Sequence, residues 1–88
     1  MKLKQVFENG LSIVIYLNDN SKCYNIEHPD IGSCYSASSE LGVFEQHYFP
    51  TDLVDAFEYA NLVQEVLAIA NTKNLSVDLL QELGYTVG

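Results

Sequence analysis

The spacing of apolar residues changes once along this chain, near residue 50, and this change constrains the fold more than any other feature. Before it, apolar and polar residues mostly alternate, which is typical of strands that bury one face. From Thr51 to Thr72, apolar residues recur every three or four positions, which predicts a helix about 31 Å long at ~1.5 Å per residue. Strands followed by helices, without alternation of the two, predict an α+β domain.

Asn9-Gly10 is the clearest turn signal in the first half, because both central residues of a type I′ hairpin turn need positive φ. A two-residue turn at this point places Val6 opposite Ile13. Leu3 and Phe7 then point away from the face that carries Ile13. The first hairpin is therefore expected to have apolar side chains on both of its faces.

A second tight turn is expected at Asp19-Asn20. It places Ile15 opposite Tyr24 and Ile13 opposite Ile26, which extends one apolar face onto a third strand. The segment that follows contains two shorter candidates for strands, residues 34–37 and 43–49. The sequence therefore predicts a β-rich meander over residues 1–49, with three to five antiparallel strands.

Two helices are expected after the sheet. Thr51 is a good N-cap for the long helix, residues 51–72, and Ser76 is one for a short helix, residues 76–84. The predicted architecture is a single α+β domain over residues 1–88. Its antiparallel sheet has the long helix packed on one face and the short C-terminal helix beside it.

The long helix carries more apolar surface than one sheet face needs. The stripe expected on the sheet consists of Leu53, Phe57, Ala60, Val63, Leu67 and Ala70. A second stripe, formed by Leu62, Val66 and Ile69, is expected on the flank of the helix. Either the short helix or a second copy of the chain would cover this flank.

The sheet face without a helix is expected to leave Leu3, Phe7, Val14 and Tyr16 partly exposed, an apolar patch of the kind that marks an interface. Together with the flank stripe of the helix, this patch makes a self-associating homodimer one hypothesis for the function.

Charge excludes some functions and favours others. The net charge is −8, and residues 23–72 hold eight acidic residues but no lysine; the whole chain has no arginine. Direct binding to nucleic acid is disfavoured, because its affinity depends on cations that neutralise phosphates. The longest apolar run, Ile13 to Leu17, is far shorter than the ~20 residues that cross a bilayer, so a cytoplasmic protein that does not enter membranes is expected.

Carboxylates and aromatic rings are concentrated in residues 43–59, which contain no cation. An acidic field speeds association with a basic partner, and aromatic side chains then contribute much of the affinity. The leading hypothesis is therefore a non-enzymatic binding protein whose partner has a basic surface. The candidate binding residues are Glu40, Glu45, Tyr48, Asp52, Asp55, Glu58, Tyr59 and Glu65.

Catalysis and metal binding are weaker alternatives. A cysteine enzyme would use Cys34 as nucleophile and His47 as base, but no flanking motif supports this pair. The spacing of Cys23, His28, Cys34 and His47 resembles no common zinc signature. We therefore expect no enzymatic activity, no metal and no cofactor.

In size and charge the chain resembles the small acidic inhibitors that phages and mobile elements encode, including nucleic-acid mimics and anti-CRISPR proteins. It also resembles antitoxin and immunity proteins in these two properties. The resemblance implies an inhibitor that occupies a cationic, often nucleic-acid-binding, surface of its target.

Overall fold

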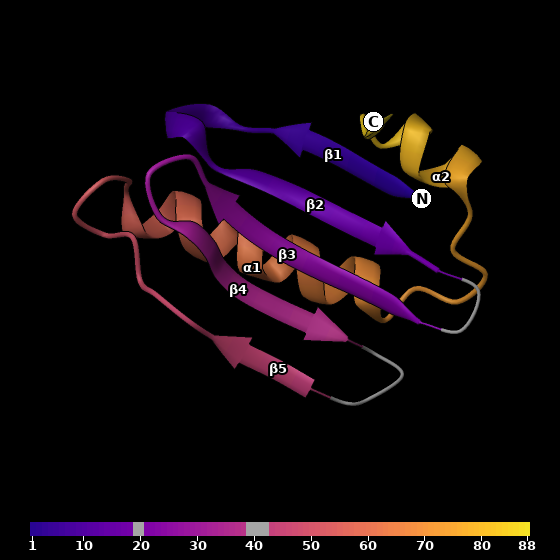
Figure 1. Ribbon diagram of the computed structural model, residues 1–88, viewed down its shortest axis with the longest axis horizontal. Coiled ribbons are helices and arrows are strands. Elements are labelled where there is room, and N and C mark those ends of the chain that lie inside the picture. The colour runs from indigo at the N-terminus through magenta and orange to yellow at the C-terminus, as the bar shows by residue number, and fades with distance from the viewer. Residues whose placement is uncertain (19–20, 39–42) are drawn as a thin grey trace.

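One antiparallel sheet forms the centre of the computed structural model, which describes residues 1–18, 21–38 and 43–88 (Figure 1). Its strands are β1 (Lys2–Val6), β2 (Ser12–Leu17), β3 (Lys22–His28), β4 (Gly32–Ser38), β5 (Val43–Gln46) and β6 (Thr86–Val87). Their order is β5-β4-β3-β2-β1-β6. The α+β prediction is confirmed. The sheet has one strand more than the predicted maximum of five, because Thr86–Val87 form β6 and pair with β1.

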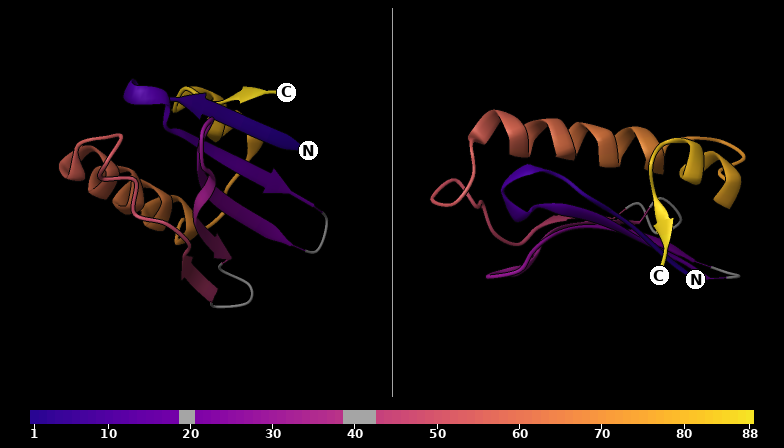
Figure 2. Two further views of the ribbon diagram at one scale, coloured as in Figure 1. Left: turned by 60° about the vertical axis from the view of Figure 1, so that its left-hand side comes forward. Right: turned by 90° about the horizontal axis from the view of Figure 1, so that it is seen from above.

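Both helices lie on the same side of the sheet (Figure 2). The long helix α1 (Ala56–Ala70) contacts β3 and β4, and the short helix α2 (Val77–Glu82) lies near the start of β1. The Ser76 hydroxyl caps α2 by accepting a hydrogen bond from the Leu79 N–H at 3.1 Å, as the sequence predicts. No helix in the described part of the chain is both long enough and apolar enough to cross a membrane.

The long helix begins later than its predicted start at Thr51. Asp55 is the N-cap, and its carboxylate accepts a hydrogen bond from the Phe57 N–H at 2.8 Å. The preceding residues form a separate turn, in which the Pro50 carbonyl accepts hydrogen bonds from the N–H groups of Leu53 and Val54. A chain that bonds back to Pro50 and is extended at Asp55 cannot be helical from Thr51 onward.

The first hairpin has a different register from the one expected. Asn9 and Gly10 do have positive φ, 61° and 82°, but the loop is one residue longer than a two-residue turn, and the Phe7 N–H donates to the Leu11 carbonyl. Val6 consequently pairs with Ser12 rather than Ile13. Because side chains alternate along a strand, this shift by one residue reverses both faces of β1. Leu3 is therefore in the core, while Lys2, Lys4 and Val6 are on the open face.

The pairing of the second and third strands is confirmed. Ile13 pairs with Ile26 and Ile15 with Tyr24, and all four side chains are buried in the core. The turn at Asp19-Asn20 lies outside the described residues. The register that the sequence predicted from a tight turn is therefore confirmed by the strand pairing itself.

The core lies between the sheet and the helices, and α1 presents a different stripe to it than the sequence suggested. Leu62, Val66 and Ile69, expected on the flank, are buried in the core, whereas Phe57 is 81 % exposed and Leu53 is 47 % exposed. The buried stripe also includes Tyr59 and Ala70, and Val63 is partly buried against it, so two members of the expected stripe do contact the core. Packing through Tyr59, Leu62, Val66 and Ile69 removes four large side chains from water. Leu62, Val66 and Ile69 therefore belong to the core and do not form an exposed stripe on the flank of the helix.

The open face of the sheet is polar rather than apolar. One row of paired residues crosses it from Lys4 through Val14, Asn25 and Ser36 to Glu45. Val14 in the middle of this row is only 1 % exposed. The expected apolar patch is therefore absent from the described part of this face.

The expected patch also included Leu3, which is in the core, and Phe7 and Tyr16. Phe7 is on the helix side and packs against the core. Tyr16 is on the open face but half-buried, and its hydroxyl donates a hydrogen bond to the Glu27 carboxylate at 3.2 Å. Desolvation raises the pKa of the Tyr16 hydroxyl, and the charge of Glu27 raises it further.

Candidate functional site

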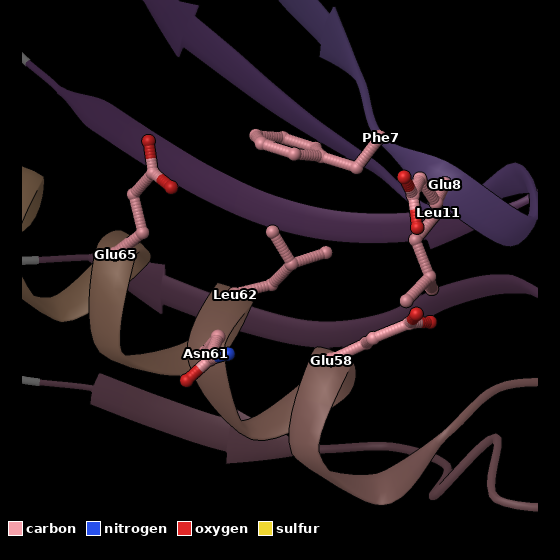
Figure 3. A pocket seen from close by; sticks show the side chains of 7 residues that line it. All are labelled: Phe7, Glu8, Leu11, Glu58, Asn61, Leu62 and Glu65. Atoms are coloured by element: carbon pink, nitrogen blue, oxygen red, sulfur yellow. The ribbon is translucent and has the colours of Figure 1, made fainter.

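The two helices do not cover the whole helix-side face of the sheet. Because α1 runs over β3 and β4 while α2 lies near the start of β1, the corner above the turn between β1 and β2 is left open. A cavity of about 350 Å³ occupies this corner (Figure 3). Its lining residues, which we call the acidic cleft, are Phe7, Glu8, Leu11, Glu58, Asn61, Leu62 and Glu65.

The acidic cleft has an apolar floor and a charged rim. Leu11 and Leu62 are almost completely buried, and Phe7 is half-buried beside them. The carboxylates of Glu8 and Glu58 lie at one end of the cleft and that of Glu65 at the other (Figure 3). An apolar side chain with a cation beside it would therefore find complementary groups at both levels of the cleft.

Hydrogen bonds hold two of these carboxylates in place. The Asn9 side-chain amide donates to the Glu58 carboxylate, which joins the turn before β2 to α1. The hydroxyl of Tyr85 donates to the Glu65 carboxylate at 3.5 Å. Tyr85 is 1 % exposed, and its burial raises the pKa of its hydroxyl strongly, with a further increase from the charge of Glu65.

The negative charge of the cleft is not neutralised within the described residues. Glu8, Glu58 and Glu65 form no ion pair with any of them. Lys2 and Lys4 belong to the open face of the sheet, on the side of β1 that points away from the cleft. The rim therefore presents three uncompensated carboxylates above an apolar surface.

The structure divides the binding residues predicted from sequence among several places. Glu58 and Glu65 line the cleft, whereas Asp52 lies in the turn before α1 and Asp55 caps that helix. Glu45 lies in β5, where its carboxylate is 4.0 Å from His47 Nε2.

The remaining binding residues predicted from sequence are Tyr48, Tyr59 and Glu40. Tyr48 is exposed beyond β5, and Tyr59 is buried in the core. Glu40 lies outside the described residues. Sequence reasoning missed Glu8 and Leu11 and placed Phe7 on the other face of the sheet, because only the pairing of β1 with β2 brings this turn next to α1.

Cys34 and His47, the candidate catalytic pair, have their side chains on different sides of the sheet. The Cys34 side chain is buried in the core, and desolvation raises the pKa of its thiol. His47 is hydrogen-bonded to the Ser36 hydroxyl at 3.0 Å on the open face. Among residues 1–18, 21–38 and 43–88, no three histidine, cysteine or acidic side chains gather as a metal site would require.

No known protein family, curated protein or solved structure matches this chain. The chemistry of the cleft must therefore be interpreted from its own geometry. Exposed carboxylates around an apolar floor attract cations over long range and retain apolar groups by contact.

Proposed function

We propose that this protein is a non-enzymatic binding protein that uses the acidic cleft to engage a basic surface of another protein. One observation carries the proposal: Glu8 of the first hairpin and Glu58 and Glu65 of α1 surround one apolar floor, and none is paired with a described cation. The ligand that satisfies both layers is an apolar side chain with lysine or arginine beside it.

The two layers of the cleft have different physical roles. The carboxylates, together with the net charge of −8, steer a basic partner toward the protein and raise the association rate by about 10 to 10³. The floor formed by Phe7, Leu11 and Leu62 lowers the dissociation rate, because a buried anchor side chain contributes most of the retained affinity.

Partners with such surfaces include nucleic-acid-binding proteins, whose cationic sites neutralise phosphates. Occupation of such a site by this protein would block it, as expected for a nucleic-acid-mimicking inhibitor of the phage or anti-CRISPR type, or for an antitoxin or immunity protein. The cleft supports this part of the proposal only through its charge and shape.

The test uses a fluorescent basic peptide that has leucine at its centre and arginine on both sides. The variant E8Q/E58Q/E65Q removes the three rim charges but keeps hydrogen-bond acceptors at each position. Rim pairs contribute about 0.5 kcal/mol each, so the variant should bind the peptide about tenfold more weakly at low salt. Added salt should weaken binding to the unmodified protein and reduce the difference between the two.

The matched control is D52N/D78N/E82Q, which loses the same charge at exposed positions that do not line the cleft. Its affinity should stay within about twofold of the unmodified protein. Equal weakening of both variants would show attraction to overall charge alone, and the proposal would then be wrong.

A further inference from the structure

We propose a second interaction surface, separate from the acidic cleft: the free edge of β5 binds an extended segment of a partner protein as an additional strand. In that segment, apolar residues alternate with lysine or arginine. The inference does not depend on the proposed function of the cleft, because it rests on residues of β5 and the groove beside it, none of which lines the cleft.

The backbone of β5 has hydrogen-bonding groups available for such a strand. β5 ends the sheet, and within the described residues it pairs with β4 alone. The His47 N–H donates to the Cys34 carbonyl at 2.8 Å, and antiparallel ladders alternate, so Glu45 also bonds toward β4. The N–H and C=O groups of Phe44 and Gln46 therefore point away from β4, toward the free edge.

An apolar groove lies beside this edge on the helix side. It has a volume of about 280 Å³, and Gln46 of β5 is at its border. Phe49, Tyr59 and Val63 form apolar walls, with the rings of Phe49 and Tyr59 in an edge-to-face contact at 5.6 Å. Phe44, which pairs with the core residue Ala37 and so faces the same side, is 46 % exposed.

The two faces of the edge differ in chemistry, and this difference defines the ligand. Side chains of an added strand that point to the helix side would meet Phe44 and the groove. Those that point to the other side would lie next to Glu45, whose side chain is 61 % exposed. Because side chains alternate along a strand, the best ligand has apolar and cationic residues at alternate positions.

A basic partner fits this edge better than a second copy of the chain. Antiparallel pairing of β5 with its own copy in the register that joins the outward-facing Phe44 to Gln46 of the copy would set Glu45 directly opposite the Glu45 of the copy. Like charges directly opposite each other destabilise a strand pair, and each chain also carries a net charge of −8. A cation opposite Glu45 reverses the sign of this interaction.

The experiment uses a synthetic peptide of alternating lysine and valine, with amide hydrogen exchange of the full chain read by NMR. On binding, the amides of Phe44 and Gln46 should become about tenfold more protected, while those of β6 at the other edge should not change. The same measurement is made with the E8Q/E58Q/E65Q variant, in which binding at the cleft is weakened. Protection of the Phe44 and Gln46 amides should persist in this variant, which separates the inference from the function of the cleft.

Two variants test the backbone contact itself. F44P removes the outward N–H of Phe44 without removing a bond to β4, and F44A is its control for loss of the ring. F44P should bind about tenfold more weakly than F44A. The inference is overturned if the peptide does not bind at millimolar concentration, if binding leaves the amides of Phe44 and Gln46 unprotected, or if light scattering shows a dimer that F44P converts to a monomer.

Discussion

The Tyr59 hydroxyl of α1 donates a hydrogen bond to the side-chain amide oxygen of Gln46 in β5 at 2.7 Å. The amide nitrogen of the same Gln46 donates to the Cys34 carbonyl of β4 at 2.9 Å. One side chain therefore connects the helix to the two outermost strands on that side of the sheet. Because Tyr59 is otherwise buried, its hydroxyl needs this partner.

Replacement of Tyr59 by phenylalanine should lower the free energy of unfolding by about 1 to 2 kcal/mol, because the Gln46 acceptor then loses its donor. Urea unfolding followed by circular dichroism measures the change. Y48F is the matched control: Tyr48 is exposed, and its loss of a hydroxyl should cost less than about 0.5 kcal/mol. Equal costs for the two variants would contradict the structural role of the Tyr59 bond.

Burial of Tyr85 predicts how stability depends on alkaline pH. The pKa of this tyrosine is raised in the folded protein, so its neutral form stabilises the fold below the unfolded pKa of about 10. As the pH rises above that value, the unfolded state releases the proton first, and stability falls by up to ~1.4 kcal/mol per pH unit for this group.

The variant Y85F should therefore lose less stability between about pH 10 and pH 11 than the unmodified protein. Some loss should remain, because burial also raises the pKa values of Tyr16, Tyr35 and Tyr59. Urea titrations at several pH values provide the comparison. Identical slopes for both proteins would mean that Tyr85 is accessible to solvent.

The orientation of α1 can be tested with two truncations on its opposite sides. I69A removes a buried side chain and should cost about 2 to 5 kcal/mol. F57A truncates a ring that is mostly exposed and should change stability by no more than about 0.5 kcal/mol. The reverse order would mean that the helix packs through the stripe first expected from the sequence.

The two cysteines should react with a thiol reagent at different rates. Cys23 is half-buried, whereas Cys34 is fully buried, and desolvation raises the pKa of both thiols. Ellman's reagent should therefore label Cys23 first and reach Cys34 only when the protein unfolds. C23S and C34S identify the site of each phase. Fast labelling of Cys34 at neutral pH would instead support the cysteine-enzyme alternative.

Local patterns predicted the parts of the fold in which a single solution matches the apolar residues. The tight turn expected at Asp19-Asn20 placed Ile13 opposite Ile26 and Ile15 opposite Tyr24, with all four apolar side chains on one face, and the strands do pair in this register. The apolar pattern did not determine the register of the first hairpin, because Leu3 and Val6 lie on opposite faces of β1 and either face could be buried. The length of its turn then decided the register.

The acidic cleft could be foreseen only in part. Glu58 and Glu65 belong to the acidic part of the sequence and were expected at a binding surface, but their neighbours there were not. Glu8 and Phe7 reach them through strand pairing, and the opening between the elements exists because two helices do not cover the six strands of the sheet. Neither effect leaves a signal in a window of a few residues.

The amino-acid pattern alone was sufficient for the α+β class, for the capping of α2 by Ser76 and for the strongly acidic character of the chain, because these depend on local spacing and on composition. Which stripe of α1 is buried, which face of β1 carries Leu3 and where the acidic cleft lies were decided by packing in three dimensions. Competing local solutions differ little in energy, and only the burial of apolar surface across the whole core selects among them.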